Sequence, residues 1–218
     1  DHAWISNPGK YIGEIFKSYL KNGGTFRQDR VGQVLDGSVR LRGGSVLLAD
    51  KIVLATGAWS KALAKFLGIK TKIESERGYH LFLSNANQRP PCPFLLANSK
   101  FVVTPMEGGI RCAGLVELGG LSEKLSKAPI AFLKRKIKEL YPNLIFEKEE
   151  YWLGHRPSTP DNLPLIGKVR DYPNVILACG SQHLGLTIGP KIGSIVSDIV
   201  FKSPINIDLS PFKVDRFS

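Results

Sequence analysis

The apolar positions in the first third of the chain predict a long helix followed by short strands. Helical spacing runs through Tyr11, Ile12, Ile15, Phe16, Tyr19 and Leu20. The pair Gly23-Gly24 ends this helix, because glycine readily adopts the left-handed conformation of a helix C-terminus. Short apolar runs between turn residues predict strands at 25–34, 45–48 and 51–55, and helical spacing returns at 60–67.

From about Ile69 the pattern changes to longer strands. These are predicted at 79–83, 101–104, 110–113 and near 151–153. The turn residues Glu107-Gly108-Gly109 join the two middle strands as a hairpin. A basic amphipathic helix at 130–141 precedes the last strand. We therefore expect a mostly antiparallel sheet with helices on one side.

The last third contains a buried strand, a glycine-bearing turn and a long helix. The strand is Val175–Ala178, and the apolar face of the helix carries Ile192, Ile195, Val196, Ile199 and Val200. The first N–H groups of a helix have no partner within it, and the N-terminal end of its dipole is positive. A helix that starts from such a turn is therefore suited to binding an electron-rich or anionic group.

Composition is ordinary for a globular protein apart from the charge. The chain has 218 residues, 43% of them hydrophobic, and 30 basic against 19 acidic residues give a net charge of +11. The basic residues are spread from Lys10 to Lys213, and the densest group, 134–138, lies on the predicted amphipathic helix. We interpret it as a solvated face, because no nucleic-acid recognition motif accompanies the charge.

Cysteine use and hydropathy point to the reducing interior of the cell. Cys92, Cys112 and Cys179 have neither disulfide-like nor metal-site spacing, and the last two lie in apolar strand patterns. We expect no metal. No apolar run approaches the length of a membrane span. The expected location is cytoplasmic, either free or peripheral on the inner face of the membrane.

Two motifs carry a family resemblance. Residues 154–167, GHRPSTPDNLPLIG, and residues 180–190, GSQHLGLTIGP, together resemble the closing part of the FAD-dependent amine oxidoreductases that include D-amino-acid dehydrogenases, glycine oxidases and sarcosine oxidases. The D-amino-acid dehydrogenase branch, which includes D-hydroxyproline dehydrogenases, is the most similar. Residues 54–60, LATGAWS, and 77–80, RGYH, add weaker matches.

The resemblance implies an α/β fold in two parts. Residues 1–68 and 157–218 correspond to the rear of an FAD-binding dinucleotide domain, and 69–156 to an antiparallel substrate domain. Members of the family begin with a G-x-G-x-x-G unit that binds the pyrophosphate, and this sequence contains none after a strand. We expect the chain to be the C-terminal half of such an enzyme, as a fragment or as one polypeptide of a split enzyme, inactive alone and able to form homo- or hetero-oligomers.

The resemblance also implies which residues contact FAD. They share positions at strand ends and in the turn before the last helix: Val31, Ala55, Thr56, Gly57, Trp59, Gly180, Ser181, Gln182, Leu184, Gly185, Leu186 and Thr187. Relatives often carry histidine where this chain has Ser181, so the chemistry of that turn differs in detail. For each position the alternative is an ordinary strand or turn residue without a ligand.

Candidate substrate residues follow from the same comparison. Arg156 stands where the family grips the substrate carboxylate, and a guanidinium suits that role because it makes two parallel charge-assisted bonds. Tyr79 and Phe101 are expected at the cavity wall, although a buried core residue is a strong alternative for Tyr79. His80 and His183 are the candidate catalytic residues; for His183, a side chain satisfied by a backbone carbonyl is an equally good interpretation.

The sequence thus predicts oxidative deamination of a D-amino acid or a cyclic imino acid. A hydride would pass from the α-carbon to flavin N5, and electrons would leave to a quinone or another carrier. The alternative is a non-catalytic subunit or degenerate remnant that does not bind FAD by itself. No nucleic-acid partner is expected.

Overall fold

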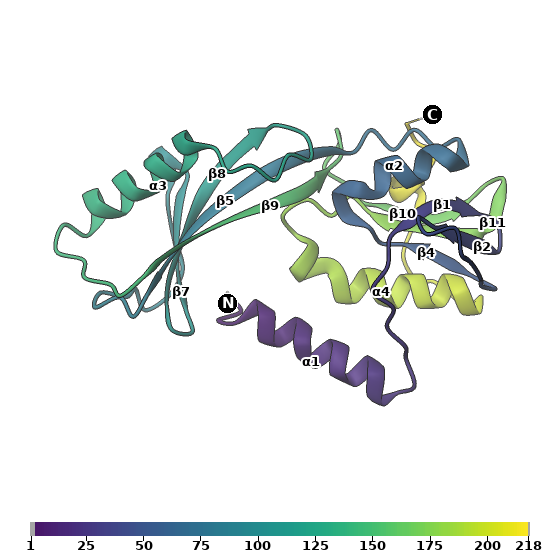
Figure 1. The fold of residues 1–218 in the computed structure, drawn as a ribbon, viewed down its shortest axis with the longest axis horizontal. Helices are drawn as coiled ribbons and strands as arrows, with labels where there is room; N and C mark the ends of the chain where they lie inside the picture. The colour runs from purple at the N-terminus through teal and green to yellow at the C-terminus, as the bar shows by residue number, and fades with distance from the viewer. Residues whose placement is uncertain (1–2, 218) are drawn as a thin grey trace. The chain divides into compact units, whose positions relative to one another are not determined.

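The computed structural model describes residues 3–217, which divide into two compact units (Figure 1). One unit comprises residues 3–28, 78–117 and 123–154, and the other comprises 29–77, 118–122 and 155–217. Three strands, at residues 74–84, 109–118 and 149–158, continue across the division between the units. We call the first the sheet unit, after its five-stranded sheet, and the second the turn unit, after the turn at residues 180–184.

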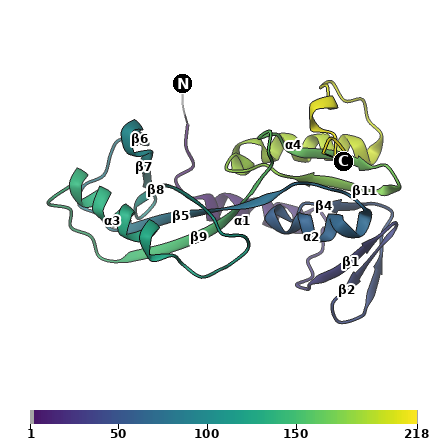
Figure 2. The ribbon, with the colours of Figure 1, turned by 90° about the horizontal axis from the view of Figure 1, so that it is seen from above.

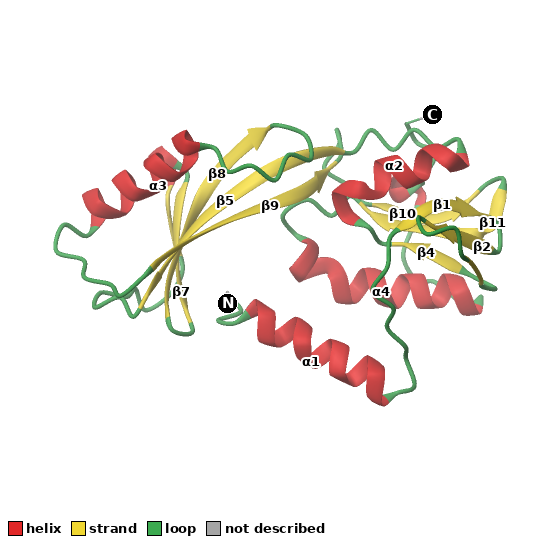
Figure 3. Cartoon of the chain, in the orientation of Figure 1, coloured by secondary structure: helices red, strands yellow, loops and turns green. Residues whose placement is uncertain are grey.

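The central sheet of the turn unit has the strand order β10-β11-β4. Its strands are β4 (Ile52–Leu54), β10 (Leu165–Val169) and β11 (Tyr172–Cys179). β11 is antiparallel to β10 and parallel to β4, with Val175 opposite Ile52 and Leu177 opposite Leu54. Helix α4 (Gly185–Phe201) packs on this sheet through Ile195 and Ile199 (Figure 3).

A second small sheet in the turn unit contains β1 (Val31–Leu35), β2 (Ser38–Leu41) and β3 (Val46–Leu48). Figure 2 shows β1 and β2 standing apart from β11. The other face of the main sheet carries the short helices η1 (Gly57–Trp59), α2 (Ser60–Ala64) and η2 (Lys65–Leu67), and η4 (Ser210–Phe212) lies near the C-terminus. Val34 joins the core of the main sheet, which anchors the small sheet to it.

The sheet unit contains an antiparallel sheet of five strands in the order β6-β7-β8-β5-β9. They are β5 (Glu74–Ser84), β6 (Phe94–Leu96), β7 (Phe101–Met106), β8 (Gly109–Leu118) and β9 (Glu149–Ser158), with η3 (Ala97–Ser99) between β6 and β7. Helix α3 (Lys127–Leu140) covers one face of this sheet (Figure 1). Helix α1 (Pro8–Lys21) has no buried residue.

Strand alternation divides the five-stranded sheet into an apolar face and a mixed face. Successive side chains of a strand point to opposite sides of the sheet. The face beneath α3 is a closed core that includes Tyr79, Leu81, Phe101, Ile110, Cys112, Leu133 and Ile137. Residues one position out of step, such as His80 and Arg111, therefore lie on the opposite face, which we call the outer face.

The fold class predicted from the sequence is confirmed, with differences in detail. The strand predicted over 25–34 begins only at Val31, and β2, β6 and β10 were not predicted. The compact units divide after Arg77 and Gly154, whereas the predicted domains divide after residues 68 and 156, and residues 3–28 group with the five-stranded sheet. The roles assigned to the two parts stay predictions. None of the helices within residues 3–217 combines the length and apolar character needed to cross a bilayer.

Candidate functional site

The turn between β11 and α4 is held in a conformation that depends on glycine. Gly180 has φ +82°, and a Cβ atom there would lie 2.9 Å from Cγ2 of Thr159. Gln182 also has positive φ, and its backbone N–H donates to the Pro157 carbonyl at 3.1 Å. This hydrogen bond attaches the turn to the end of β9, one residue from Arg156.

The start of α4 presents free backbone donors. Leu184, at the N-cap, makes no side-chain cap, and the first turn contains no acidic residue. Thr187 and Ile188 donate to the Leu184 carbonyl at 2.8 and 2.9 Å. The N–H groups of Gly185 and Leu186 have no acceptor among residues 3–217. Together with the helix dipole they can bind an electron-rich group.

The loop after β4 lies at the same sheet edge, because parallel neighbours end on the same side. Ala55 and Thr56 are exposed, Gly57 has φ +54°, and the hydroxyls of Thr56 and Ser60 are 2.9 Å apart. Trp59 is 49% exposed. Its ring contacts His155 edge to face, with ring centroids 5.4 Å apart.

These contacts join the residues on either side of Arg156 to the two loops. His155 Nδ1 lies 2.8 Å from the Ser75 hydroxyl, which orients the imidazole that Trp59 contacts. Arg156 itself is half-buried and makes no hydrogen bond or ion pair within residues 3–217. Ser158, on the same side of β9 by strand alternation, has a buried hydroxyl without a partner in the same residue range. The guanidinium is therefore available for an external anion.

Val31 is not brought into this cluster by any recorded contact. It begins β1, an edge strand of the small sheet, and its half-buried side chain packs against the apolar core. An adenine contact through its backbone stays a prediction. Among the other turn residues, His183 and Thr187 are exposed and Ser181 is half-buried.

The candidates in the sheet unit occupy two different environments. Tyr79 and Phe101 are fully buried in the core beneath α3, and the Tyr79 hydroxyl donates to Glu117 at 2.5 Å. This placement favours a structural role for both, and their contact with substrate stays a prediction. His80 lies on the outer face, where its ring stacks on Trp152 with centroids 5.0 Å apart. Burial and the charge of Arg111 lower the pKa of His80 to about 4.

Sequence reasoning missed Arg111 and Trp152. The signal was present in the alternation Ile110-Arg111-Cys112, since a charged residue between two apolar ones in a strand marks the face opposite the core. The pairing of Trp152 with His80 depends on strand order, with β9 beside β5, and cannot be read from the sequence.

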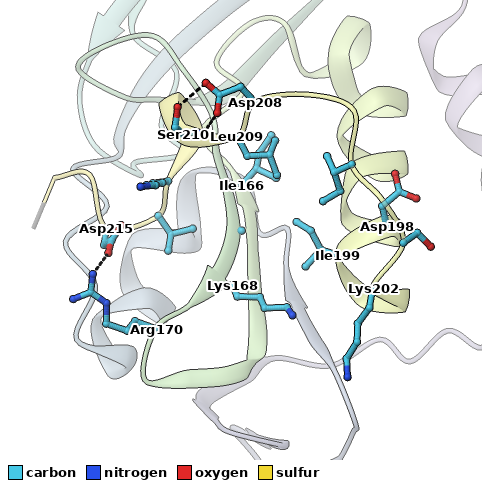
Figure 4. A pocket seen from close by; sticks show the side chains of 15 residues that line it. Ile166, Lys168, Arg170, Asp198, Ile199, Lys202, Asp208, Leu209, Ser210 and Asp215 are labelled. Carbon is cyan, nitrogen blue, oxygen red and sulfur yellow. Dashed lines mark hydrogen bonds and ion pairs between the residues drawn. The ribbon is translucent and has the colours of Figure 1, made fainter.

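A hollow of about 790 Å³ lies away from the predicted residues, between β10, the end of α4 and the C-terminal segment (Figure 4). Arg170 pairs with Asp215 at 3.0 Å, and the Ser210 hydroxyl donates to Asp208 at 2.7 Å. Bases and acids nearly balance along its lining. Its lining includes none of the candidate site residues from the sequence analysis.

A parallel strand pair with free helix N–H groups at its carboxyl edge is an arrangement typical of dinucleotide-binding proteins. Comparison with known proteins agrees. Residues 1–199 match the family model described as FAD dependent oxidoreductase. The chain belongs to this family of FAD dependent oxidoreductases.

Individual relatives show the same similarity. The chain is 31% identical to a D-amino-acid oxidase and 30% identical to a D-amino acid dehydrogenase, both from Bradyrhizobium diazoefficiens. These matches cover 97% and 100% of the chain but 52% of each relative, so the chain spans about half their length. The crystal structure of iminodiacetate oxidase from Chelativorans sp. BNC1 superposes with a TM-score of 0.83 at 19% identity, covering 94% of this chain and 57% of that one.

The turn geometry predicts a specific response to Gly180→Ala. The left-handed backbone costs alanine about 1–2 kcal/mol, and the Thr159 methyl adds a steric penalty. Urea unfolding should show a lower free energy of unfolding for Gly180→Ala. Adding Thr159→Ser, which removes the methyl group, should recover the steric part of this loss but not the backbone part. Gly189→Ala is the matched control, because no heavy atom lies within 4 Å and the helix favours alanine. Unchanged stability of Gly180→Ala would contradict this description of the turn.

The environment of His80 predicts an acid-sensitive fold. Its pKa is about 4 in the folded protein against 6.5 for the free group, so the unfolded chain binds this proton more readily. The contribution of neutral His80 to the free energy of unfolding is fully present above pH 6.5 and is lost as the pH falls towards 4. NMR titration of the ring gives its pKa directly, and unfolding curves of His80→Gln should lack this part of the pH dependence. Titration of His80 near 6.5 would refute the assignment.

Proposed function

We propose that this chain supplies the carboxylate site and part of the FAD site of an oxidoreductase acting on the C–N bond of an amino acid. The observation that carries the proposal is the half-buried, unpaired Arg156, which is joined through Pro157 to the turn that starts α4. Membership of the FAD dependent oxidoreductase family supports the cofactor.

The residues at this edge fit a flavin ring. Gly57 and Gly180 have positive φ, a backbone conformation that glycine adopts without strain and that shapes the two loops at this edge. The N–H groups of Gly185 and Leu186 are free to donate to the N1–C2=O edge of the ring, where the positive end of α4 favours negative charge. Bound FAD supplies a hydride acceptor at N5. Ala55, Thr56 and Trp59 form the neighbouring loop that would line the cofactor.

Arg156 binds the substrate carboxylate through its planar fork and so sets the orientation of the α-carbon. Because the amine reacts in its neutral form, no strong protein base is required. The exposed His183 would then line the cavity or orient the amine rather than abstract a proton. The names of the two Bradyrhizobium relatives support a D-amino acid as substrate. A cyclic imino acid is the other member of the proposed class.

The proposal includes a second polypeptide segment, from the same gene product or a separate chain. Relatives are about twice as long as this chain. The outer edge of β4 has no partner strand among the described residues, and Val53 there is 40% exposed. A strand from that segment would complete the sheet. Similarity to a protein named D-amino acid dehydrogenase supports electron transfer to a quinone or another carrier.

Replacement of Arg156 by lysine tests the carboxylate role in the complete flavoenzyme. Lysine keeps the charge but loses the bidentate geometry, so transition-state stabilisation should fall by about 1–3 kcal/mol. Steady-state kinetics should show the loss in kcat/KM while FAD content stays constant. Arg170→Lys, at an exposed ion pair away from the loops, is the matched control. Equal kcat/KM for Arg156→Lys and the parent would reject the role.

Leu186→Pro tests the flavin contact. Proline is tolerated in the first helical turn and removes the one N–H that Leu186 offers, whereas the control Leu186→Ala retains it. Loss of a hydrogen bond to the reduced, anionic ring should cost about 1.5–3 kcal/mol. A more negative flavin reduction potential in the proline variant alone is expected. Equal potentials would rule out this contact, and a protein that takes up no FAD would favour a non-catalytic subunit.

A further inference from the structure

A second hollow, of about 440 Å³, lies between the C-terminal end of α3 and the five-stranded sheet, and we call it the α3 hollow. Leu81 and Leu83 line it from β5, Ile137 lines it from α3, and Leu144 lines it from the loop that follows the helix. Leu81 and Leu83 are each 1% exposed and Ile137 is 5% exposed, so the inner lining is apolar. A volume of this size with a mostly apolar lining is typical of small-molecule sites.

Hydrogen bonds hold the loop that closes the α3 hollow. The Ile145 N–H donates to the Asn87 side chain at 2.8 Å, and the Ile145 carbonyl accepts from the Asn87 N–H at 2.9 Å. The Glu147 N–H donates to the Ser84 carbonyl at 2.9 Å. Phe146, which lines the hollow, lies between these two attachments in the chain. The hollow is therefore preformed, and a ligand does not have to order the loop in order to bind.

The charged residues that line the α3 hollow leave one ammonium without a counter-charge. Lys134 Nζ donates to Glu149 Oε1 at 2.9 Å. Arg135 Nε lies 3.6 Å from Glu139 Oε1 on the same helix. Lys138 is exposed and makes no hydrogen bond or ion pair within residues 3–217. The lining therefore combines an apolar surface with one uncompensated positive charge at its exposed rim.

We propose that the α3 hollow binds a straight-chain carboxylate. The hydrocarbon chain packs against Leu81, Leu83 and Ile137, and its removal from water supplies most of the affinity. The carboxylate pairs with Lys138, which fixes the orientation of the chain. The hydroxyl of Tyr141, one helical turn further on, makes no hydrogen bond within the described chain and can donate to the same carboxylate.

This binding site goes beyond the proposed function, because none of the residues that line the α3 hollow is a candidate FAD or substrate residue. Leu81 and Leu83 point to the side of the sheet beneath α3, away from the outer face that carries His80. Binding requires neither FAD nor turnover, so the 218-residue chain can be tested directly. Octanoate is the probe, hexanoate is its shorter homologue, and octylammonium is its counterpart of equal chain length and opposite charge.

Methyl NMR of the 218-residue chain both measures the binding and locates it. Octanoate should shift the methyl signals of Ile137 and Leu81 saturably. It should bind about fifteenfold more tightly than hexanoate, because each buried methylene contributes about fourfold to the affinity. Octylammonium should bind at least about tenfold more weakly than octanoate, because three basic residues and one acidic residue line the hollow.

Two variants test the charge and the volume of the α3 hollow separately. Lys138→Glu should lower the ratio of octanoate affinity to octylammonium affinity by at least about tenfold, because it reverses the charge at the rim. Lys127→Glu is the matched control, since it makes the same change on α3, lies outside the hollow and suits the first helical turn. Leu144→Trp should weaken the binding of both ligands, because the indole fills the space that the chain would occupy.

Several outcomes would overturn the proposal. They are no saturable shift with octanoate, equal affinities for octanoate and octylammonium, or an unchanged affinity ratio in Lys138→Glu. Signals that move only at Ile12 and Ile15 would place the ligand on the exposed apolar residues of α1 and reject the hollow as its site. Circular dichroism identifies any variant that does not fold, and Lys138→Glu, at an exposed position, keeps the test valid if Leu144→Trp does not fold.

Discussion

The parallel pairing of β4 with β11 is the interaction on which the candidate site depends. Val175 lies opposite Ile52 and Leu177 opposite Leu54, so both strands run in the same direction and end at one edge. Their following loops, which begin at Ala55 and Gly180, must therefore start side by side. An antiparallel pair would have placed those loops at opposite edges. The apolar residues at this register are core residues, so their burial helps to fix where the two loops begin.

The end of β9 is attached to that edge by contacts that leave its charge free. The Gln182 N–H bonds to the Pro157 carbonyl, and the His155 ring is held between Trp59 and Ser75. Backbone and ring contacts thus position the strand without using the Arg156 guanidinium. The same holds for α4, where the turn fixes the helix start but no acidic side chain caps it. The Arg156 guanidinium and the N-terminal end of α4 are thus both positioned without a counter-charge. An external anion can bind them for this reason.

The sequence predicted the helices and strands better than it predicted which side of a strand each side chain occupies. The apolar spacing of Ile192, Ile195 and Ile199 identified α4, and the turn at Gly108 identified the β7–β8 hairpin, because both signals are local. β10 was missed because its pattern is short and contains Gly167. For residues 77–80 the resemblance suggested a cavity for both Tyr79 and His80. Neighbouring residues in a strand cannot share a face, and the packing of α3, which is not a local property, decided that Tyr79 is buried.

The two units place their accessible polar groups at different positions relative to the apolar core. In the turn unit the polar groups stand beyond strand ends, where glycines with positive φ shape the backbone and the strands between them remain apolar. In the sheet unit they stand within strands, because α3 covers only one face and period-two alternation leaves the other face for Thr104, His80 and Arg111. A one-residue shift of register would bury Arg111 beneath α3 and expose Cys112. The apolar core therefore specifies the register, and through it the orientation of the charged group.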